Sequence, residues 1–213
     1  GYDKLMTTWT DITNPEVAVG APLSTALMTA LRDNIVAFAE RDPSAPKVLG
    51  DFQFIARAVI SNDATVDFTG FNNSIFDGYF FTFANIEAAS DLRSIYARTS
   101  SDGGGTYDGG SVDYRDDGTA NGSGQAQMTL ASVGNNSAEQ GFTGDLRIYG
   151  AGLSTKRTRM AWGGGTTSSS GVFVAVSGVA ERTANAEVDA IRFFINSGNI
   201  ESGTITMYGM RND

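Results

Sequence analysis

Carboxylates crowd a glycine-rich stretch in the middle of the chain. The cluster comprises Asp102, Asp108, Asp113, Asp116 and Asp117. Oxygen-rich loops of this kind bind Ca²⁺ in some proteins, and two carboxylates roughly 5–9.5 Å apart are the machinery of glycoside hydrolysis. The spacing does not match an EF-hand loop. We therefore favour a solvated acidic turn and expect no metal, no cofactor and no catalytic residue here.

A turn motif overlaps this cluster. Residues 100–107 follow the Asp-box pattern S-x-D-x-G-x-T-[WFY], through Ser100, Asp102, Gly104, Thr106 and Tyr107. In such a turn the Ser and Asp side chains bind turn amides, the glycine permits an unusual backbone angle, and the aromatic ring closes the base of a hairpin. The motif is best known from sialidases, where it recurs on several blades away from the catalytic site. A single copy predicts a structural role.

Trp162 is the candidate for ligand contact. It precedes Gly163–Gly165 and the polar run Thr166–Ser170, which we expect to form a loop. A Trp beside a polar loop is suited to stacking on a sugar ring. The alternative, which stays open at this point, is a Trp buried at the end of a strand.

Composition excludes several classes of function. The chain of 213 residues has no Cys and no His, which rules out Ser-His-Asp and Cys-His triads and the usual zinc sites. Its net charge of −9 argues against nucleic acid as a partner, because phosphate binding requires clustered Lys and Arg. No apolar run approaches the ~20 residues of a membrane span. We predict that the protein is not an enzyme.

One amphipathic helix is predicted near the N-terminus. Behind Pro22, apolar residues recur at steps of three and four, and Pro43 ends the pattern. The apolar stripe of an isolated helix must be covered, either by the protein's own β domain or by copies of itself or a neighbouring protein. We favour the second interpretation. The predicted assembly residues are Trp9, Leu27, Met28, Leu31, Ile35 and Phe38.

The N-terminal segment also resembles that of tailed-phage and gene-transfer-agent-like virion proteins of alphaproteobacteria. The resemblance lies in four short sequence segments that occur in the same order as in those proteins: Trp9–Ile12, Val19–Ser24, Ala30–Asn34 and Ala45–Lys47. In those families the segment precedes varied β domains of fibres, spikes and minor structural proteins. The resemblance therefore implies an attachment or oligomerisation module, usually trimeric, exposed on a particle.

Residues after Phe52 alternate in polarity with period two, in short runs separated by Gly, Asn and Asp. This pattern predicts an antiparallel β-sandwich. Two segments have similar sequences, G-D-L-R-I-Y-G at 144–150 and G-T-I-T-M-Y-G at 203–209. Two related hairpins on opposite sheets would suit a jelly roll. We predict a mainly β protein, with an attachment segment at 1–50 that holds one helix and a jelly-roll-like sandwich at 51–213.

These patterns lead to a first hypothesis and two alternatives. The first is a virion structural protein, a head or tail fibre or spike component, that binds copies of itself and other virion proteins and displays a domain for host-surface glycan. The second is a decoration or adaptor subunit without a receptor role. The third is a carbohydrate-active enzyme that uses Asp or Glu.

Overall fold

A computed structural model describes residues 10–12, 24–40, 52–116, 124–133, 141–167 and 171–211. For residues 38–40 only the backbone is described. The chain divides into two compact units, Gly1–Gly50 and Asp51–Asp213.

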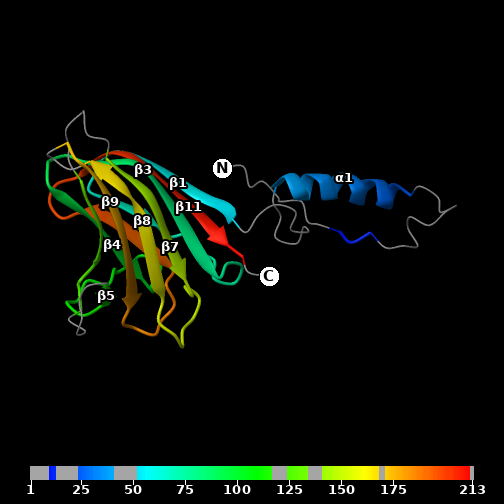
Figure 1. The fold of residues 1–213 in the computed structure, drawn as a ribbon. Coiled ribbons are helices and arrows are strands. Elements are labelled where there is room, and N and C mark those ends of the chain that lie inside the picture. The colour runs from blue at the N-terminus through cyan, green and yellow to red at the C-terminus, as the bar shows by residue number, and fades with distance from the viewer. Residues whose placement is uncertain are drawn as a thin grey trace. The chain divides into compact units, whose positions relative to one another are not determined.

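The first unit contains one helix, α1 (Thr25–Glu40; Figure 1). The helix begins at Thr25, a little after the start predicted at Pro22, because Ser24 caps it. The Ser24 Oγ accepts a hydrogen bond from the Leu27 amide at 3.1 Å, and the Ser24 carbonyl accepts one from the Met28 amide at 3.1 Å. A Ser at this position satisfies amides that have no partner within the helix.

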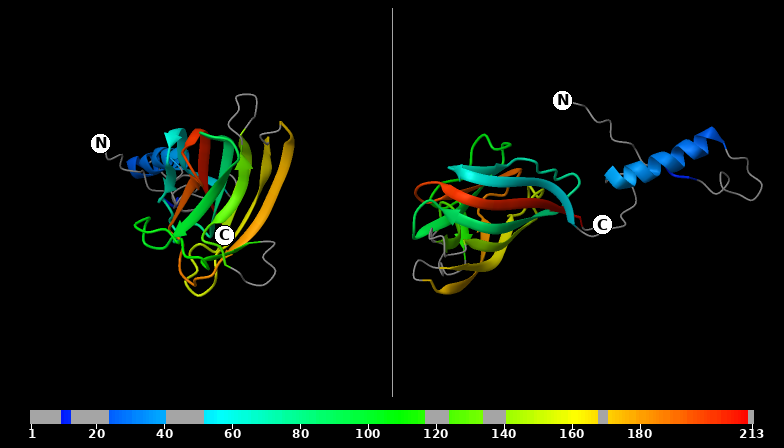
Figure 2. Two further views of the ribbon diagram at one scale, coloured as in Figure 1. Left: turned by 90° about the vertical axis from the view of Figure 1, so that its left-hand side faces the viewer. Right: turned by 90° about the horizontal axis from the view of Figure 1, so that it is seen from above.

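The second unit is a sandwich of two antiparallel sheets (Figures 1 and 2). Among the described residues, one sheet has seven strands in the order β1-β11-β3-β7-β8-β9-β5, and the other has four in the order β2-β10-β4-β6. The strands of the larger sheet are β1 (Phe52–Asp63), β3 (Gly78–Ala88), β5 (Tyr114–Asp116), β7 (Phe142–Tyr149), β8 (Arg159–Thr167), β9 (Phe173–Arg182) and β11 (Ile200–Met210). Those of the smaller sheet are β2 (Thr65–Phe68), β4 (Arg93–Ser100), β6 (Met128–Val133) and β10 (Ala190–Ile195).

The pairing of the strands is that of a jelly roll. The first strand pairs with the last, β1 with β11, and successive pairs follow inward: β2 with β10, β3 with β7, and β4 with β6. These pairs lie alternately in the larger and the smaller sheet, as they must when one long antiparallel ribbon is rolled on itself. The β8–β9 hairpin and β5 extend the larger sheet beyond β7. The predicted fold class is confirmed.

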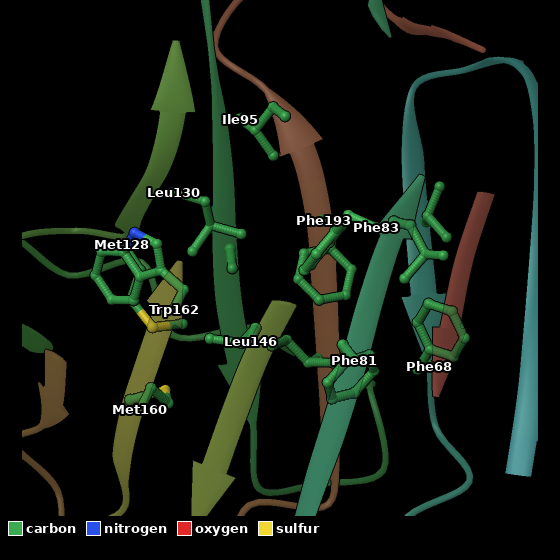
Figure 3. Packing of buried hydrophobic residues seen from close by; sticks show 14 of the residues in the cluster. Phe68, Phe81, Phe83, Ile95, Met128, Leu130, Leu146, Met160, Trp162 and Phe193 are labelled. Carbon is green, nitrogen blue, oxygen red and sulfur yellow. The ribbon is translucent and has the colours of Figure 1, made fainter. Parts of the chain in front are cut away.

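Aromatic side chains from both sheets fill the core (Figure 3). Phe193 of β10 lies 5.5 Å from Phe81 and 5.2 Å from Phe83 of β3, measured between ring centroids, and Phe68 of β2 lies 5.4 Å from Phe81. All four are at most 4% exposed. The inward-facing residues of each strand therefore meet in one hydrophobic core, which holds the two sheets together.

Two local predictions are corrected by the sheet topology. The similar segments at 144–150 and 203–209 do not belong to hairpins on opposite sheets: both lie in the larger sheet, as β7 and β11 on either side of β3. Each follows a strand of the smaller sheet, β6 or β10, so each unit is an arch from one sheet to the other. In addition, Gly163–Gly165 are part of β8, paired with β7 and β9, and do not form a loop.

Candidate functional site: two exposed apolar surfaces

The helix α1 has two different apolar faces. Leu27, Asn34 and Ala37 lie on a buried face, and Asn34 fixes the segment before the helix: its Oδ1 accepts from the Thr10 amide at 2.7 Å, and its Nδ2 donates to the Thr10 carbonyl at 2.8 Å. A second face carries Met28, Leu31 and Ile35, which are 53%, 42% and 71% exposed. Steps of three and four place these three residues side by side, and we call them the α1 stripe.

The α1 stripe contains three of the six predicted assembly residues. Leu27 is 5% exposed and already buried within its own chain, so it is not available to a second copy, and its assignment to assembly is corrected. Trp9 and the side chain of Phe38 lie outside the described residues.

The larger sheet carries an aromatic patch on its outer face. It consists of Phe52 and Phe54 on β1, Phe80 on β3 and Tyr208 on β11, and we call it the outer aromatic patch. Ring centroids are 5.0 Å apart for Phe52 and Phe80, 6.2 Å for Phe54 and Tyr208, and 6.1 Å for Phe80 and Tyr208. Phe52 and Phe54 are 47% and 49% exposed. The predictions from sequence did not include this patch, although the unbroken aromatic run Tyr79-Phe80-Phe81 was a visible signal.

A pocket of about 520 Å³ opens at the same end of the sandwich. Its lining includes Asp77, Tyr149 and Leu153. Asn73 also lines it but is committed to the fold, since it donates to the Val188 carbonyl at 3.0 Å and accepts from the Tyr79 hydroxyl at 3.1 Å. The groups that remain for a ligand are the half-exposed Tyr149 ring and the Asp77 carboxylate.

The Asp-box residues form a tight hydrogen-bonded turn after β4. Asp102 accepts from the amide and the hydroxyl of Thr106, at 2.8 and 2.7 Å, and from the Ser100 hydroxyl at 2.7 Å. These bonds lower the pKa of Asp102 to about 2, since they stabilise its ionised form. Gly104 has φ +88°, which suits a residue without a Cβ.

The turn closes against the sandwich instead of closing a hairpin. β4 lies in the smaller sheet, whereas the next strand, β5, pairs with β9 in the larger sheet. The Tyr107 ring packs under the Arg192 guanidinium of β10, with 4.2 Å between the guanidinium carbon and the ring centroid. Arg192 is held in place by Asp67 through two bonds of 2.8 and 2.7 Å. The aromatic residue of the motif thus fixes the loop to the four-stranded sheet.

The three loop carboxylates whose side chains the structure describes, Asp102, Asp108 and Asp113, do not converge on one point. Asp108 binds the buried Arg182 at 2.6 Å, and Asp113 accepts a hydrogen bond from the Gly110 amide at 2.6 Å. Asp102 accepts hydrogen bonds within its own turn. Asp117 lies outside the described residues. Among the residues that the structure describes, no group of three or more acidic side chains is placed to hold a metal ion.

Arg182 anchors this loop from inside the sandwich. It is 2% exposed, and besides Asp108 it donates to the Ser101 hydroxyl at 3.2 Å and to the Ala186 carbonyl at 3.1 Å. Beside it, Tyr114 is buried and its hydroxyl accepts from the Thr99 amide at 2.6 Å. Burial raises the pKa of Tyr114 to about 12, so the phenol is neutral at neutral pH. Arg182 and Tyr114 therefore hold the loop in place.

Trp162 is buried and offers no exposed ring for a ligand. Its side chain is 7% exposed and belongs to the core (Figure 3). The ring covers Gly178, its partner on β9: a Cβ at that position would lie 2.2 Å from Trp162 Cζ2. The prediction of a sugar contact at Trp162 is therefore wrong, and the alternative of a buried Trp is correct.

Comparison with known proteins found no match: the chain matches no family model, and no curated protein matches it. Within the described parts of the chain, no helix is long and apolar enough to cross a bilayer.

Proposed function

We propose that this chain is a noncatalytic structural subunit of a phage-like virion that self-associates through the α1 stripe and displays its jelly roll. The observation that carries the proposal is the helix with one face fixed by Asn34 and a second face of exposed Met28, Leu31 and Ile35. Exposed apolar stripes of this spacing bind other helices. The resemblance of the N-terminal segment to virion proteins supplies the setting.

Self-association through α1 is tested by Leu31→Asp in the full chain. A carboxylate in the stripe would be desolvated in a helix interface, at a cost of several kcal/mol for an unpaired charge. We expect light scattering to give an oligomer for the wild type and 22.4 kDa for the variant. Thr29→Asp is the matched control, since it places the same charge at an exposed position off the stripe and should leave the oligomer intact. An unchanged mass for Leu31→Asp would contradict the proposal.

Host-surface glycan is the ligand that we propose for the displayed domain. The pocket beside Tyr149 replaces Trp162 as the expected site, because it combines an accessible ring with the Asp77 carboxylate. Pockets of roughly 300–1,000 Å³ with a few polar groups are typical of small-ligand sites, and a carboxylate accepts hydrogen bonds from sugar hydroxyls.

One antibody experiment tests both the exposure of the sandwich domain on the particle and its role in attachment to a host. Antibodies against the sandwich domain are expected to label particles purified from the source culture in electron micrographs, and their Fab fragments should block adsorption of those particles to host cells. Labelling without inhibition would favour the decoration or adaptor role. Particles that lack the protein altogether would contradict the virion proposal.

A further inference from the structure

The outer face of the larger sheet gathers aromatic side chains where β1, β11 and β3 meet at one end, and Val59 on β1 and Phe173 and Val179 on β9 are further exposed apolar residues of this sheet. On β3 and β11 the inward residues Phe81 and Met207 are buried, yet their outward neighbours Phe80 and Tyr208 are aromatic too. Strands that are apolar on both faces are typical of sheets covered on both sides. One row further along the same strands, the outward residues are Thr82 and Thr206. The outer aromatic patch is thus a local feature that calls for a cover.

Two neighbouring rows of outward residues cross the strands β1, β11, β3 and β7. The aromatic row reads Phe54, Tyr208, Phe80, Arg147, and the polar row reads Arg57, Thr206, Thr82, Asp145. Both rows carry residues of opposite character at their two ends: a ring and a guanidinium in the first, a guanidinium and a carboxylate in the second. Within one chain, the Arg147 guanidinium carbon lies 5.5 Å from the Phe80 centroid and its Nε lies 3.6 Å from Asp145 Oδ1, so the carboxylate of the polar row also takes part in a half-exposed ion pair of its own chain.

These rows complement themselves under a two-fold rotation. When two such faces meet about an axis parallel to the strands, between β11 and β3, each row lies against the same row reversed. Phe54 then faces Arg147 of the second copy, and Tyr208 faces its Phe80. In the polar row, Arg57 faces Asp145 of the second copy, and Thr206 faces its Thr82. Rings meet rings or a guanidinium, and charges meet opposite charges.

We propose that a second copy of this chain covers the outer aromatic patch, face to face, about this two-fold axis. Such an isologous contact uses one surface patch on both partners. The charges decide for this occupant: a chain of net charge −9 repels its own copies, but Arg57, Arg147 and Asp145 give this face both signs in matching places. The inference deepens the proposed self-association and assigns it two copies per contact, where the resemblance to fibres predicts three.

Chain connectivity supports the same occupant. The patch starts at Phe52, and only residues 41–51 separate it from the end of α1 at Glu40. Eleven residues span at most about 40 Å. Copies held together through the α1 stripe therefore keep their aromatic patches within a short tether of each other, which raises the effective concentration of one patch for the next. The inference rests on the proposed function for this step alone.

A charge-swap cycle in the full chain tests the proposal. Arg57→Glu sets like charges against Asp145 of the second copy at both ends of the interface, and Asp145→Arg does the same to Arg57. Since like charges across an interface repel each other, each single variant should weaken dimerisation at least about tenfold in a light-scattering concentration series. The double variant Arg57→Glu/Asp145→Arg restores opposite signs and should regain most of the affinity. Arg115→Glu, an exposed charge on β5 at the far edge of the sheet, is the matched control.

The outcomes separate this inference from the role of α1. A dimer of twice 22.4 kDa that follows the charge-swap cycle supports it, whatever Leu31→Asp does. If Leu31→Asp dissociates the dimer or trimer and the charge variants leave it unchanged, the face-to-face contact is overturned and the proposed function stands. A monomeric wild type overturns both.

Thiol labelling distinguishes the second copy from two other possible occupants of the patch, the chain's own α1 and a soluble ligand. Thr206→Cys gives the chain a single thiol, and in the proposed dimer this thiol is protected from a bulky maleimide. The matched variant Thr129→Cys, at an exposed position of β6, should react freely. Protection in a monomer, lost with Leu31→Asp, would mean that the chain's own α1 covers the patch. Full reactivity in the oligomer would leave the face open to a soluble ligand. Either result overturns the proposal.

Discussion

Replacing Phe193 by Ala is expected to lower the free energy of unfolding of the sandwich by about 3–5 kcal/mol, the usual cost of emptying a buried Phe site. Phe193 is 0% exposed and stands between the two sheets, with Phe68, Phe81 and Phe83 within 6.1 Å of it by ring centroids. No neighbour fills the space, because these rings come from strands fixed in two different sheets. A domain of ordinary stability has ~5–15 kcal/mol in total, so the variant should unfold at a much lower denaturant concentration.

The next residue provides the control. Phe194 points to the outer face of the smaller sheet, where its ring lies 5.5 Å from Tyr96 and 5.0 Å from the Arg98 guanidinium carbon. Phe194→Ala removes an aromatic pair but opens no cavity, so we expect a loss of about 0.5–1.5 kcal/mol. Chemical denaturation followed by fluorescence measures both variants. Equal losses would mean that the alternation of β10 between core and outer face does not set its energetics.

The second large effect is expected for Asp108→Ala. This change leaves the guanidinium of Arg182, 2% exposed, without its carboxylate. Breaking a buried ion pair from one side costs about 3–5 kcal/mol, and we expect the lower end of that range, because the Asp108 side chain is 25% exposed and Arg182 keeps its bonds to Ser101 and Ala186. The loop from Ser101 onward should also become more accessible to protease.

Two comparisons identify the buried charge as the cause. In Asp108→Ala/Arg182→Met the unpaired charge is gone, so part of the lost stability should return. Glu181→Ala removes a carboxylate of nearly equal exposure, 24%, whose partners Arg157 and Arg159 are 37% and 76% exposed. Those cations return to water, and the cost should stay at about 1 kcal/mol or less. A loss for Glu181→Ala as large as that for Asp108→Ala would contradict this explanation.

The sequence predicts the sandwich well because alternation is a local property. The predicted period-two alternation holds along β3, where Tyr79, Phe81 and Phe83 share a face in the core, since side chains alternate along any strand. Pairing between strands is not local. The sequences of residues 144–150 and 203–209 do not determine that both segments pair with β3. The prediction therefore assigned these two similar segments to opposite sheets, whereas they lie in the same one.

The candidate sites show the same limit. In the Asp-box turn, Ser100, Asp102, Gly104 and Thr106 lie within seven residues and bind one another, so these hydrogen bonds follow from the motif. The burial of Trp162 depends on Gly178, which lies on the next strand and meets the ring only once β8 and β9 pair. The outer aromatic patch likewise assembles from β1, β3 and β11, and only the register of three strands brings Phe54, Tyr208 and Phe80 into one row.

The place of β11 sets the order in which the protein can be made. In its sheet β1 pairs with β11 alone, and β11 also separates β1 from β3, yet it is the last described strand to leave the ribosome. Ribosomes add roughly 5–20 residues per second, so β1 waits through the synthesis of most of the domain before its partner exists. Pairings this distant in sequence make folding slow. The sandwich must therefore close after translation has passed Met210, and until then the nascent chain presents unpaired, apolar strand edges to the chaperones of the cell that makes it.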